Sequence, residues 1–491
     1  MEVRLTHRSW NEIECDLLVI PLFEDEGLDE EFFSGLDQGL GGLLSELRET
    51  EEWLGKRYQC TIVHRPQGVR SRRLALLGAG KRASWDSEAV RRTVARVFGQ
   101  VKGYKLRRVA VVVRIEGDVA AATQATSEGV VLAAYSADEY KTAAKSKAFI
   151  EEVVLAQEPE GDVQGLEEAV RRGQILGEAT NLARSLVNQP GNQINPSRLA
   201  ERSRVLGEKV GLEVEVLGEP EMREMGMETL LAVAQGSDEP ARFIILKHLK
   251  DPQSDAPPIV FVGKGVTFDS GGLSLKSAGS MKDMKADKAG ACAVLAAMQA
   301  IARLQIERNV IGLIPAVENM VSGRAQRPGD VIRSMGGKTV EIVNTDAEGR
   351  LILADALCYA SEFSPEYVVD IATLTGACII ALGNIRAGLF SNNDELCERL
   401  QSAGDRAGEK FWRLPLDDEY RKDLDSGIAD IKNSGSRSAG AVTAAKFLQE
   451  FVGEFSWCHI DIAGVDLYED PVEGTGATGF GARTLVELAS N

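Results

Sequence analysis

Four carboxylates in the second half of the chain are the residues best placed to do chemistry. They are Asp269, Asp287, Asp346 and Glu348. Carboxylates gathered in a half-buried site repel one another and are costly to desolvate unless a cation neutralises them. Two adjacent divalent ions that share bridging carboxylates would do so, as in two-metal hydrolases. Because the chain has only 4 histidines, these residues predict an oxygen-rich shell for Mn²⁺, Zn²⁺ or Mg²⁺.

The spacing of these residues allows other interpretations. Asp346 and Glu348 are two residues apart and face the same way if the backbone there is extended. Acidic residues near turns are also common as helix caps or solvated charges, and Asp287 precedes a predicted helix as an N-cap would. Lys264 and Lys276 could be surface charges or ion-pair partners. A two-metal phosphohydrolase could use the same carboxylates, so spacing alone leaves the substrate open.

The elements that must position these side chains are short apolar runs alternating with helical patterns. Such alternation predicts an α/β fold. Strands are predicted around the carboxylates at residues 259–263, 310–315, 339–343, 367–371 and 457–462, and helices at 289–304 and 351–363. Ligand sites in open α/β sheets lie at the carboxyl ends of the strands. The acidic segments fall at predicted strand ends or helix starts.

The first half of the chain shows the same alternation. Strands are predicted at residues 15–21, 73–77 and 108–113, with helices at 87–101 and 163–187. A polar tract at residues 157–162 predicts a boundary. We therefore expect a smaller N-terminal α/β domain over residues 1–160, and a larger C-terminal α/β domain over 161–491 with a central, mostly parallel sheet.

Composition excludes several classes of protein. The 491 residues are 44% hydrophobic, unlike a disordered chain, and carry 56 basic and 74 acidic residues for a net charge of −18. This charge argues against constitutive nucleic-acid or anionic-membrane binding. No apolar stretch is long enough to span a bilayer, and Met1–Glu12 lacks the apolar core of a signal peptide. Seven cysteines without CxxC spacing suit a reducing compartment, so we expect a cytoplasmic protein.

Several segments resemble the leucine aminopeptidase (cytosol aminopeptidase) family of dinuclear metallopeptidases. Residues 344–351 read NTDAEGRL, which looks like the complete signature octapeptide of that family. Residues 263–276, 322–330 and 370–377 also fit the family pattern. The resemblance covers about residues 165–491 well and the first 150 only in general character. It implies an aminopeptidase acting on peptides, with a macro-like N-terminal domain and a catalytic C-terminal domain.

The resemblance also implies a ligand set for two ions. The first ion would be held by Asp269, Asp346 and Glu348, with the backbone carbonyl of Asp346. The second would be held by Lys264, Asp269, Asp287 and Glu348. A lysine can be a ligand only as the neutral amine, so the neighbouring dication must displace its proton. Asp287 would also accept a hydrogen bond from the free α-amine of the substrate.

Further roles follow from the same resemblance. Lys276 would stabilise the oxyanion that develops when a bridging water attacks, and Arg350 would hold a bicarbonate ion as general base. The substrate cleft would be lined by Met284, Thr373, Leu374 and Gly376. An apolar pocket with a methionine wall favours Leu-like or Met-like first residues, although one methylene discriminates by only ~1–3 kcal/mol.

Three expectations concern the surroundings of the site. Lys288 follows Asp287 where methionine is common in relatives, and we expect its side chain to point away along the helix so that activity survives. The resemblance implies a homohexamer. Basic residues within 65–108 leave nucleic-acid binding by the N-terminal domain as an alternative that the net charge disfavours.

Overall fold

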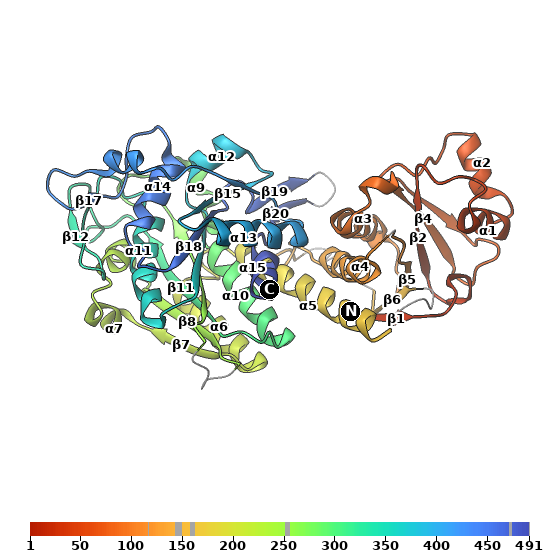
Figure 1. The fold of residues 1–491 in the computed structure, drawn as a ribbon, viewed down its shortest axis with the longest axis horizontal. Helices are drawn as coiled ribbons and strands as arrows, with labels where there is room; N and C mark the ends of the chain where they lie inside the picture. Colours follow the sequence, from red (N-terminus) through yellow and green to blue (C-terminus); the bar gives the residue numbers. More distant parts are fainter. Residues whose placement is uncertain (116, 143–149, 158–162, 251–255, 471–473, 491) are drawn as a thin grey trace. The chain divides into compact units, whose positions relative to one another are not determined.

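The chain divides into two compact units. The computed structural model describes residues 1–115, 117–142, 150–157, 163–250, 256–470 and 474–490. One unit comprises Met1–Glu178 with Asp470–Gly474, and the other comprises Ala179–Glu469 with Thr475–Asn491 (Figure 1). The division falls inside helix α5 (Val163–Asn188). The boundary predicted at residue 160 lies outside the described residues.

The N-terminal unit is built on a six-stranded sheet with the order β1-β6-β5-β2-β4-β3. Its strands are β1 (Glu2–Thr6), β2 (Leu17–Phe23), β3 (Cys60–His64), β4 (Arg73–Gly80), β5 (Arg108–Val112) and β6 (Glu152–Ala156). All neighbours run parallel except β3 and β4. Its helices are α1 (Glu31–Gly39), α2 (Leu43–Glu49), α3 (Ser87–Gln100) and α4 (Val119–Ala133).

Alternation along β2 places helices on both faces of this sheet. Val19 packs in the same apolar cluster as α3 and α4, whereas Leu18 and Ile20 pack with α1 and α2. Because successive side chains of a strand point to opposite faces, one continuous apolar strand supplies both cores. The strands and the helix predicted here are confirmed, with ends shifted by a few residues.

The C-terminal unit is built on a nine-stranded sheet with the order β16-β15-β18-β14-β9-β11-β8-β7, and β10 also pairs with β11. Its strands are β7 (Glu213–Leu217), β8 (Arg242–His248), β9 (Ile259–Gly263), β10 (Gly265–Asp269), β11 (Val310–Asn319), β14 (Tyr367–Ala372), β15 (Ala387–Ser391), β16 (Phe411–Arg413) and β18 (Ser456–Asp461). The central neighbours β18, β14, β9 and β11 run parallel. The predicted mostly parallel central sheet is confirmed.

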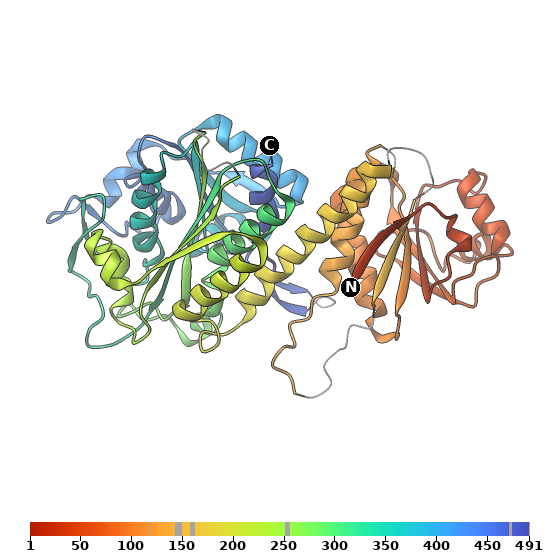
Figure 2. The same ribbon diagram turned by 90° about the horizontal axis from the view of Figure 1, so that it is seen from below.

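Helices cover both faces of this sheet (Figures 1 and 2). The strands β9 and β14 contact α10 (Ala289–Leu304), which in turn contacts α6 (Pro196–Val210) and α15 (Ala482–Ala489). Another apolar cluster joins the sheet to α8 (Glu228–Ala234), α11 (Gly349–Ala360) and α14 (Gly440–Gln449). A further helix, α13 (Asp394–Ala407), packs against α15.

Two glycines set how closely α10 approaches the sheet. A Cβ atom on Gly290 would lie 2.1 Å from the carbonyl oxygen of Ile371 in β14, and one on Gly263 would lie 2.6 Å from the carbonyl oxygen of Gly290. No larger residue fits at either position without moving the helix. The first turn of α10 therefore lies directly against the ends of β9 and β14.

The remaining elements are short. They are α7 (Glu219–Glu224), α9 (Ala278–Met281), α12 (Gly376–Leu382), β12 (Val331–Arg333), β13 (Thr339–Glu341), β17 (Ile431–Lys432), β19 (Leu467–Asp470) and β20 (Gly474–Ala477). The strand predicted at 339–343 forms as β13, but it belongs to a separate sheet with β12 and β17. Asp346 therefore does not follow a strand of the central sheet. Among the described helices, none has both the length and the apolar character that crossing a membrane requires.

Candidate metal centre

Lys264 occupies an interruption between two strands that pair with the same partner. Strand β9 pairs with the first half of β11, and β10 pairs with its second half. At Lys264, between them, the backbone N–H donates to Ile371 at 3.1 Å and the carbonyl accepts from Ala291 at 2.9 Å. The side chain is 3% exposed. The sequence prediction recognised β9 but not β10, whose residues 265–269 include a glycine and two polar residues.

The ammonium of Lys264 lies among acidic groups. Its Nζ lies 2.8 Å from Asp287 Oδ1 and 2.8 Å from Glu348 Oε1. It also donates to the carbonyl oxygen of Thr373 at 2.9 Å. Burial opposes the charge of this lysine, but the neighbouring carboxylates outweigh burial and raise its pKa. The structure thus places a cation where several oxygens from distant segments converge.

Asp269 ends β10 and is held in a fixed orientation. Its Oδ1 accepts from the side-chain amide of Asn319 and from the backbone N–H of Gly271, each at 2.8 Å. Its Oδ2 lies 2.8 Å from Lys276 Nζ. Burial raises the pKa of Asp269 to about 6, and the charge of Glu348 adds to this effect. Asn319 was not identified from the sequence, because an asparagine inside a strand pattern carries no distinctive signal.

Asp346 and Glu348 come from the loop that precedes α11. Asn433 holds this loop, because its Oδ1 accepts from Val343 at 2.9 Å and its Nδ2 donates to the Asn344 carbonyl at 2.7 Å. Glu348 has helical backbone angles, φ −78° and ψ −36°. The condition of an extended backbone, under which alternation would make the two side chains face the same way, is therefore not met at Glu348. A turn, and not strand alternation, brings the two side chains to the same place.

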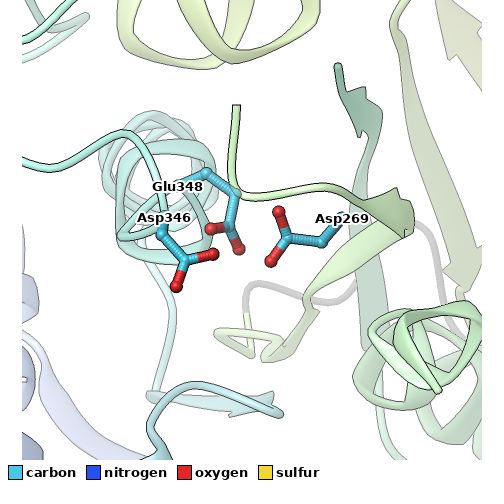
Figure 3. A group of neighbouring side chains, drawn as sticks. All are labelled: Asp269, Asp346 and Glu348. Atoms are coloured by element: carbon cyan, nitrogen blue, oxygen red, sulfur yellow. The ribbon is translucent and has the colours of Figure 1, made fainter. Parts of the chain in front are cut away.

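The carboxylates of Asp269, Asp346 and Glu348 converge and form an acidic cluster (Figure 3). One oxygen from each lies within 4.8 Å of the others. Burial raises the pKa of Asp346, whereas the pKa of Glu348 is lowered because Lys264 and Lys276 outweigh its burial. Three like charges at this separation repel strongly in a poorly solvated site.

Asp287 is joined to these carboxylates by Lys264, which contacts both Asp287 and Glu348. It follows a single 3-10 turn over Met284–Ala286 and precedes α10, whose N-cap residue is Lys288. The N-cap alternative for Asp287 is therefore wrong. Its Oδ1 accepts from the Thr373 hydroxyl at 2.7 Å. Burial raises its pKa well above the usual aspartate range.

The cluster has the donor set that divalent cations require. Asp287 Oδ2 and Glu348 Oε2 are buried and have no hydrogen-bond partner within the described part of the chain. Buried acceptors without partners are rare and need an explanation. Oxygen-rich sites of this kind suit Mn²⁺, Mg²⁺ or Zn²⁺, so the residues present fit divalent ions.

Two cationic residues adjoin the cluster. Lys276 Nζ lies 2.5 Å from Asp346 Oδ1, in addition to its contact with Asp269, and its pKa is raised because these carboxylates outweigh burial. Arg350 is buried, and its Nη1 donates to the Asn433 carbonyl at 2.9 Å. Its Nε has no partner among the described residues, and burial lowers its pKa to about 10.

The predicted cleft residues differ in what they contact. Thr373 contacts the cluster directly through its hydroxyl and its carbonyl oxygen. Leu374 packs against the apolar cluster beneath the sheet. Gly376 begins α12 and is exposed, and Met284 is half-buried. Asp461, which ends β18 and accepts hydrogen bonds from Leu374 and Thr375, was not identified from the sequence. The available signal was an acidic residue at the end of a predicted strand of the central sheet.

Lys288 points away from the carboxylates, as expected. It is fully buried, and its Nζ donates to the carbonyl oxygens of Gln189 at 2.9 Å, Lys285 at 2.5 Å and Val187 at 3.4 Å. Burial lowers its pKa to about 8. The ammonium ties the start of α10 to the end of α5 and the residue after it, and does not face the metal centre.

Some of the arginines that suggested nucleic-acid binding are engaged with acidic residues. Arg91 is buried and pairs with Glu88 and Glu128. Arg108 Nε lies 2.9 Å from Glu152 Oε2. Paired arginines contribute little to the positive field that attracts a phosphate backbone, and no observation favours this alternative.

Comparison with known proteins agrees with the geometry. Residues 181–486 match the cytosol aminopeptidase family, catalytic domain, and residues 19–144 match its N-terminal domain. A probable cytosol aminopeptidase of Geotalea uraniireducens is 43% identical over 477 residues, covering 96% of each chain. That of Solibacter usitatus is 42% identical, covering 100% of this chain and 99% of the relative.

Solved structures agree as well. A mutant of tomato leucine aminopeptidase superposes with a TM-score of 0.90 at 33% identity, covering 100% of this chain and 96% of the other. A bottromycin maturation enzyme in complex with Mn has a TM-score of 0.85 at 36% identity, covering 97% and 99%. These likenesses extend over both units, and they do not support the phosphohydrolase alternative. The chain therefore belongs to the cytosol aminopeptidase family and is a metal-dependent aminopeptidase.

Proposed function

We propose that this aminopeptidase works with two divalent ions held by five side chains. Asp269, Asp346 and Glu348, with the Asp346 carbonyl, hold the first ion. Lys264, Asp269, Asp287 and Glu348 hold the second. The observation that carries this proposal is the pair of buried carboxylate oxygens, on Asp287 and Glu348, that lack any hydrogen-bond partner among the described residues.

Lys264 changes its state when the second ion binds. Its ammonium satisfies Asp287, Glu348 and the Thr373 carbonyl in the metal-free chain. A neutral amine has the lone pair that a ligand needs, and a neighbouring dication shifts the pKa of a ligating group strongly downward. As a ligand of a divalent ion, Lys264 would therefore be the neutral amine, and its proton would have passed to solvent. Bound ions of this kind polarise a carbonyl group and lower the pKa of water towards neutrality.

The free α-amine of a peptide is recognised by Asp287 in this proposal. Its Oδ1 is already engaged by the Thr373 hydroxyl, whereas its Oδ2 has no partner. An ammonium or amine donor from the first residue of a peptide satisfies that oxygen. An internal peptide bond offers no such group at this position, which restricts cleavage to the N-terminal bond.

Lys276 and Arg350 supply the remaining chemistry. The contacts of Lys276 with Asp269 and Asp346 hold its cation at the edge of the cluster, where the side chain is 15% exposed. From there it stabilises the oxyanion that develops on the scissile carbonyl. Arg350 has an unpartnered buried Nε, and a guanidinium matches a planar oxyanion in shape and charge. We assign it the binding of bicarbonate, which serves as general base.

The preference for the first residue follows from the cleft. Met284, Thr373, Leu374 and Gly376 line it in this proposal, and Leu-like or Met-like residues are preferred. Mn²⁺ is the favoured ion because a structural neighbour is a complex with Mn, with Zn²⁺ and Mg²⁺ as alternatives. A cytoplasmic homohexamer completes the proposal.

Chelation followed by metal restoration tests this function. The chelated enzyme should release no product from aminoacyl anilides, and Mn²⁺, Zn²⁺ or Mg²⁺ added separately should restore activity to different extents. Leu and Met anilides should react fastest, and a nitrophenyl phosphate should not react. Restored hydrolysis of an N-acetylated Leu anilide would contradict the role given to the α-amine.

A further inference from the structure

The loop between β14 and α12 connects to the second half of the metal centre. The carbonyl oxygen of Thr373 accepts from Lys264 at 2.9 Å, and the Thr373 hydroxyl donates to Asp287 at 2.7 Å. Lys264 and Asp287 both belong to the proposed second-ion site, and neither is assigned to the first. The position of this loop should therefore affect ion binding at the second site and not at the first.

Asp461 holds that loop from the neighbouring strand. It is fully buried at the end of β18, paired in parallel register with Ala372 of β14. Its Oδ1 accepts from the backbone N–H groups of Leu374 at 3.1 Å and Thr375 at 3.4 Å, and its Oδ2 accepts from the Thr375 hydroxyl at 2.6 Å. Three donors from two consecutive loop residues thus converge on one carboxylate.

The same carboxylate also fixes its own strand end. Asp461 Oδ1 accepts from the Ala463 N–H at 3.1 Å, in the turn that follows β18. No lysine or arginine forms an ion pair with Asp461 in the part of the chain that the structure describes. An ionised carboxylate accepts hydrogen bonds on both oxygens and donates none, and such charge-assisted bonds are stronger than neutral ones. An asparagine would turn one acceptor into a donor, so that either the loop N–H groups or the proton of the Thr375 hydroxyl would lose its acceptor.

We propose that Asp461 is a positioning residue that builds the Lys264–Asp287 half of the metal centre through the Thr373–Thr375 loop. This inference rests on the two-ion function proposed above. Asp461 forms no hydrogen bond with Lys264 or Asp287 and acts through Leu374 and Thr375, which directly follow Thr373 in the loop. Groups that orient ligands in this way typically change metal affinity or activity by ~10–100-fold when they are removed.

Glu409 offers a control in the same unit, with the one difference that its Oε1 also lies 3.6 Å from Arg483 Nη2. It is 4% exposed, and its Oε2 accepts from the N–H groups of Gly481 at 3.1 Å and Thr484 at 3.3 Å, and from the Thr484 hydroxyl. It therefore receives the same kinds of hydrogen bond as Asp461. Those bonds fix the start of α15 and involve none of the residues of the metal centre.

Manganese titration of the full chain tests the inference. Calorimetry of the metal-free protein should resolve two Mn²⁺ sites in the wild type. In Asp461→Asn, one site should keep its affinity and the other should weaken by ~10–100-fold. In Glu409→Gln both affinities should stay unchanged. Thermal unfolding of each metal-free variant establishes that the protein is folded.

A gentler variant keeps the test decisive if Asp461→Asn does not fold. Thr375→Val removes one of the three loop donors and leaves Asp461 in place, so it should weaken the same site several-fold, while Thr375→Ser should restore it. Two unchanged affinities in Asp461→Asn or in Thr375→Val would overturn the inference, as would equal weakening of both sites. A wild type that binds fewer than two Mn²⁺ would instead overturn the proposed function, and this inference with it.

Discussion

Two sets of buried carboxylates in the C-terminal unit differ in how their oxygens are satisfied. Asp355 is fully buried, and its two oxygens accept from the N–H groups of Leu230 at 2.9 Å and Met335 at 2.8 Å. Asp287 and Glu348 are almost as buried, but each has an oxygen without a partner among the described residues, and each faces Lys264.

This difference separates structural from functional acids. A buried carboxylate whose oxygens all accept backbone N–H groups ties chain segments together and favours folding. One that keeps an unpartnered oxygen beside other carboxylates carries a desolvation penalty that an ion pair through its other oxygen, as Asp287 and Glu348 make with Lys264, offsets only in part. A divalent ion would satisfy the remaining oxygen. Hydrogen-bond satisfaction therefore indicates the role of an acid better than its burial does.

The largest expected effect is loss of activity on Asp287→Asn. Removing a ligand and amine acceptor should lower kcat/KM for a Leu anilide by more than ~100-fold, since groups that merely orient ligands already account for up to that factor. The free energy of unfolding of the metal-free protein should change little, because burial raises the pKa of Asp287 and an asparagine oxygen can still accept from Lys264 and from the Thr373 hydroxyl. Anilide kinetics and urea titration of the same preparation measure both. A variant that loses stability and keeps activity would reverse the assignment.

Manganese should stabilise the wild type by ~2.7 kcal/mol for each site when the free ion is at about 100 times its Kd. The reason is that the unpartnered oxygens gain a ligand only in the folded state. Urea denaturation with Mn²⁺, and with chelator, measures this difference. Asp287→Asn should retain a smaller stabilisation, and Asp355→Asn should retain all of it. An equal response in all three proteins would show that the ion binds elsewhere.

Asp355→Asn should destabilise the protein by ~1–3 kcal/mol, because an amide cannot accept from both N–H groups and leaves a buried donor unsatisfied. The kcat/KM of the folded fraction should stay close to that of the wild type. Urea titration combined with anilide kinetics tests this pair of expectations. A large loss of activity without loss of stability would place Asp355 among the functional acids.

The loss of stability caused by Asp355→Asn should also depend on pH, although the effect is small. Burial raises the pKa of Asp355 to about 6, from 3.8 for an ordinary aspartate. Between these values the folded state holds the proton more tightly, so this group contributes stability at low pH that is lost as pH rises through about 6. The destabilisation by Asp355→Asn should therefore be ~1 kcal/mol smaller at pH 7 than at pH 5. A difference of opposite sign would mean that Asp355 is stabilised as the anion.

Local sequence signals were sufficient for much of this fold. The residues 259–263 and 289–304 were predicted with the bounds that β9 and α10 have, because a short apolar run and a long run of small residues are each distinctive. The predicted acids Asp269, Asp346 and Glu348 do converge. Their convergence could be expected because the segments that carry them are compact motifs in the sequence.

What the sequence could not supply depends on contacts between distant segments. Asn433 holds the Asp346 loop from 87 positions further along the chain, and nothing near Asn433 marks it as special. The membership of β13 in a separate sheet and the turn at Glu348 are likewise decided by packing and not by propensity. Asp461 joins β18 to the loop after β14 only because these strands are neighbours in the sheet.

The most direct test of the central claim is a crystal structure of the chain soaked in Mn²⁺, with anomalous scattering to locate the ions. The account predicts two ions in each chain, one contacting Asp269, Asp346 and Glu348 and the other contacting Lys264, Asp269, Asp287 and Glu348. A single ion, or ions that these five side chains do not contact, would contradict it.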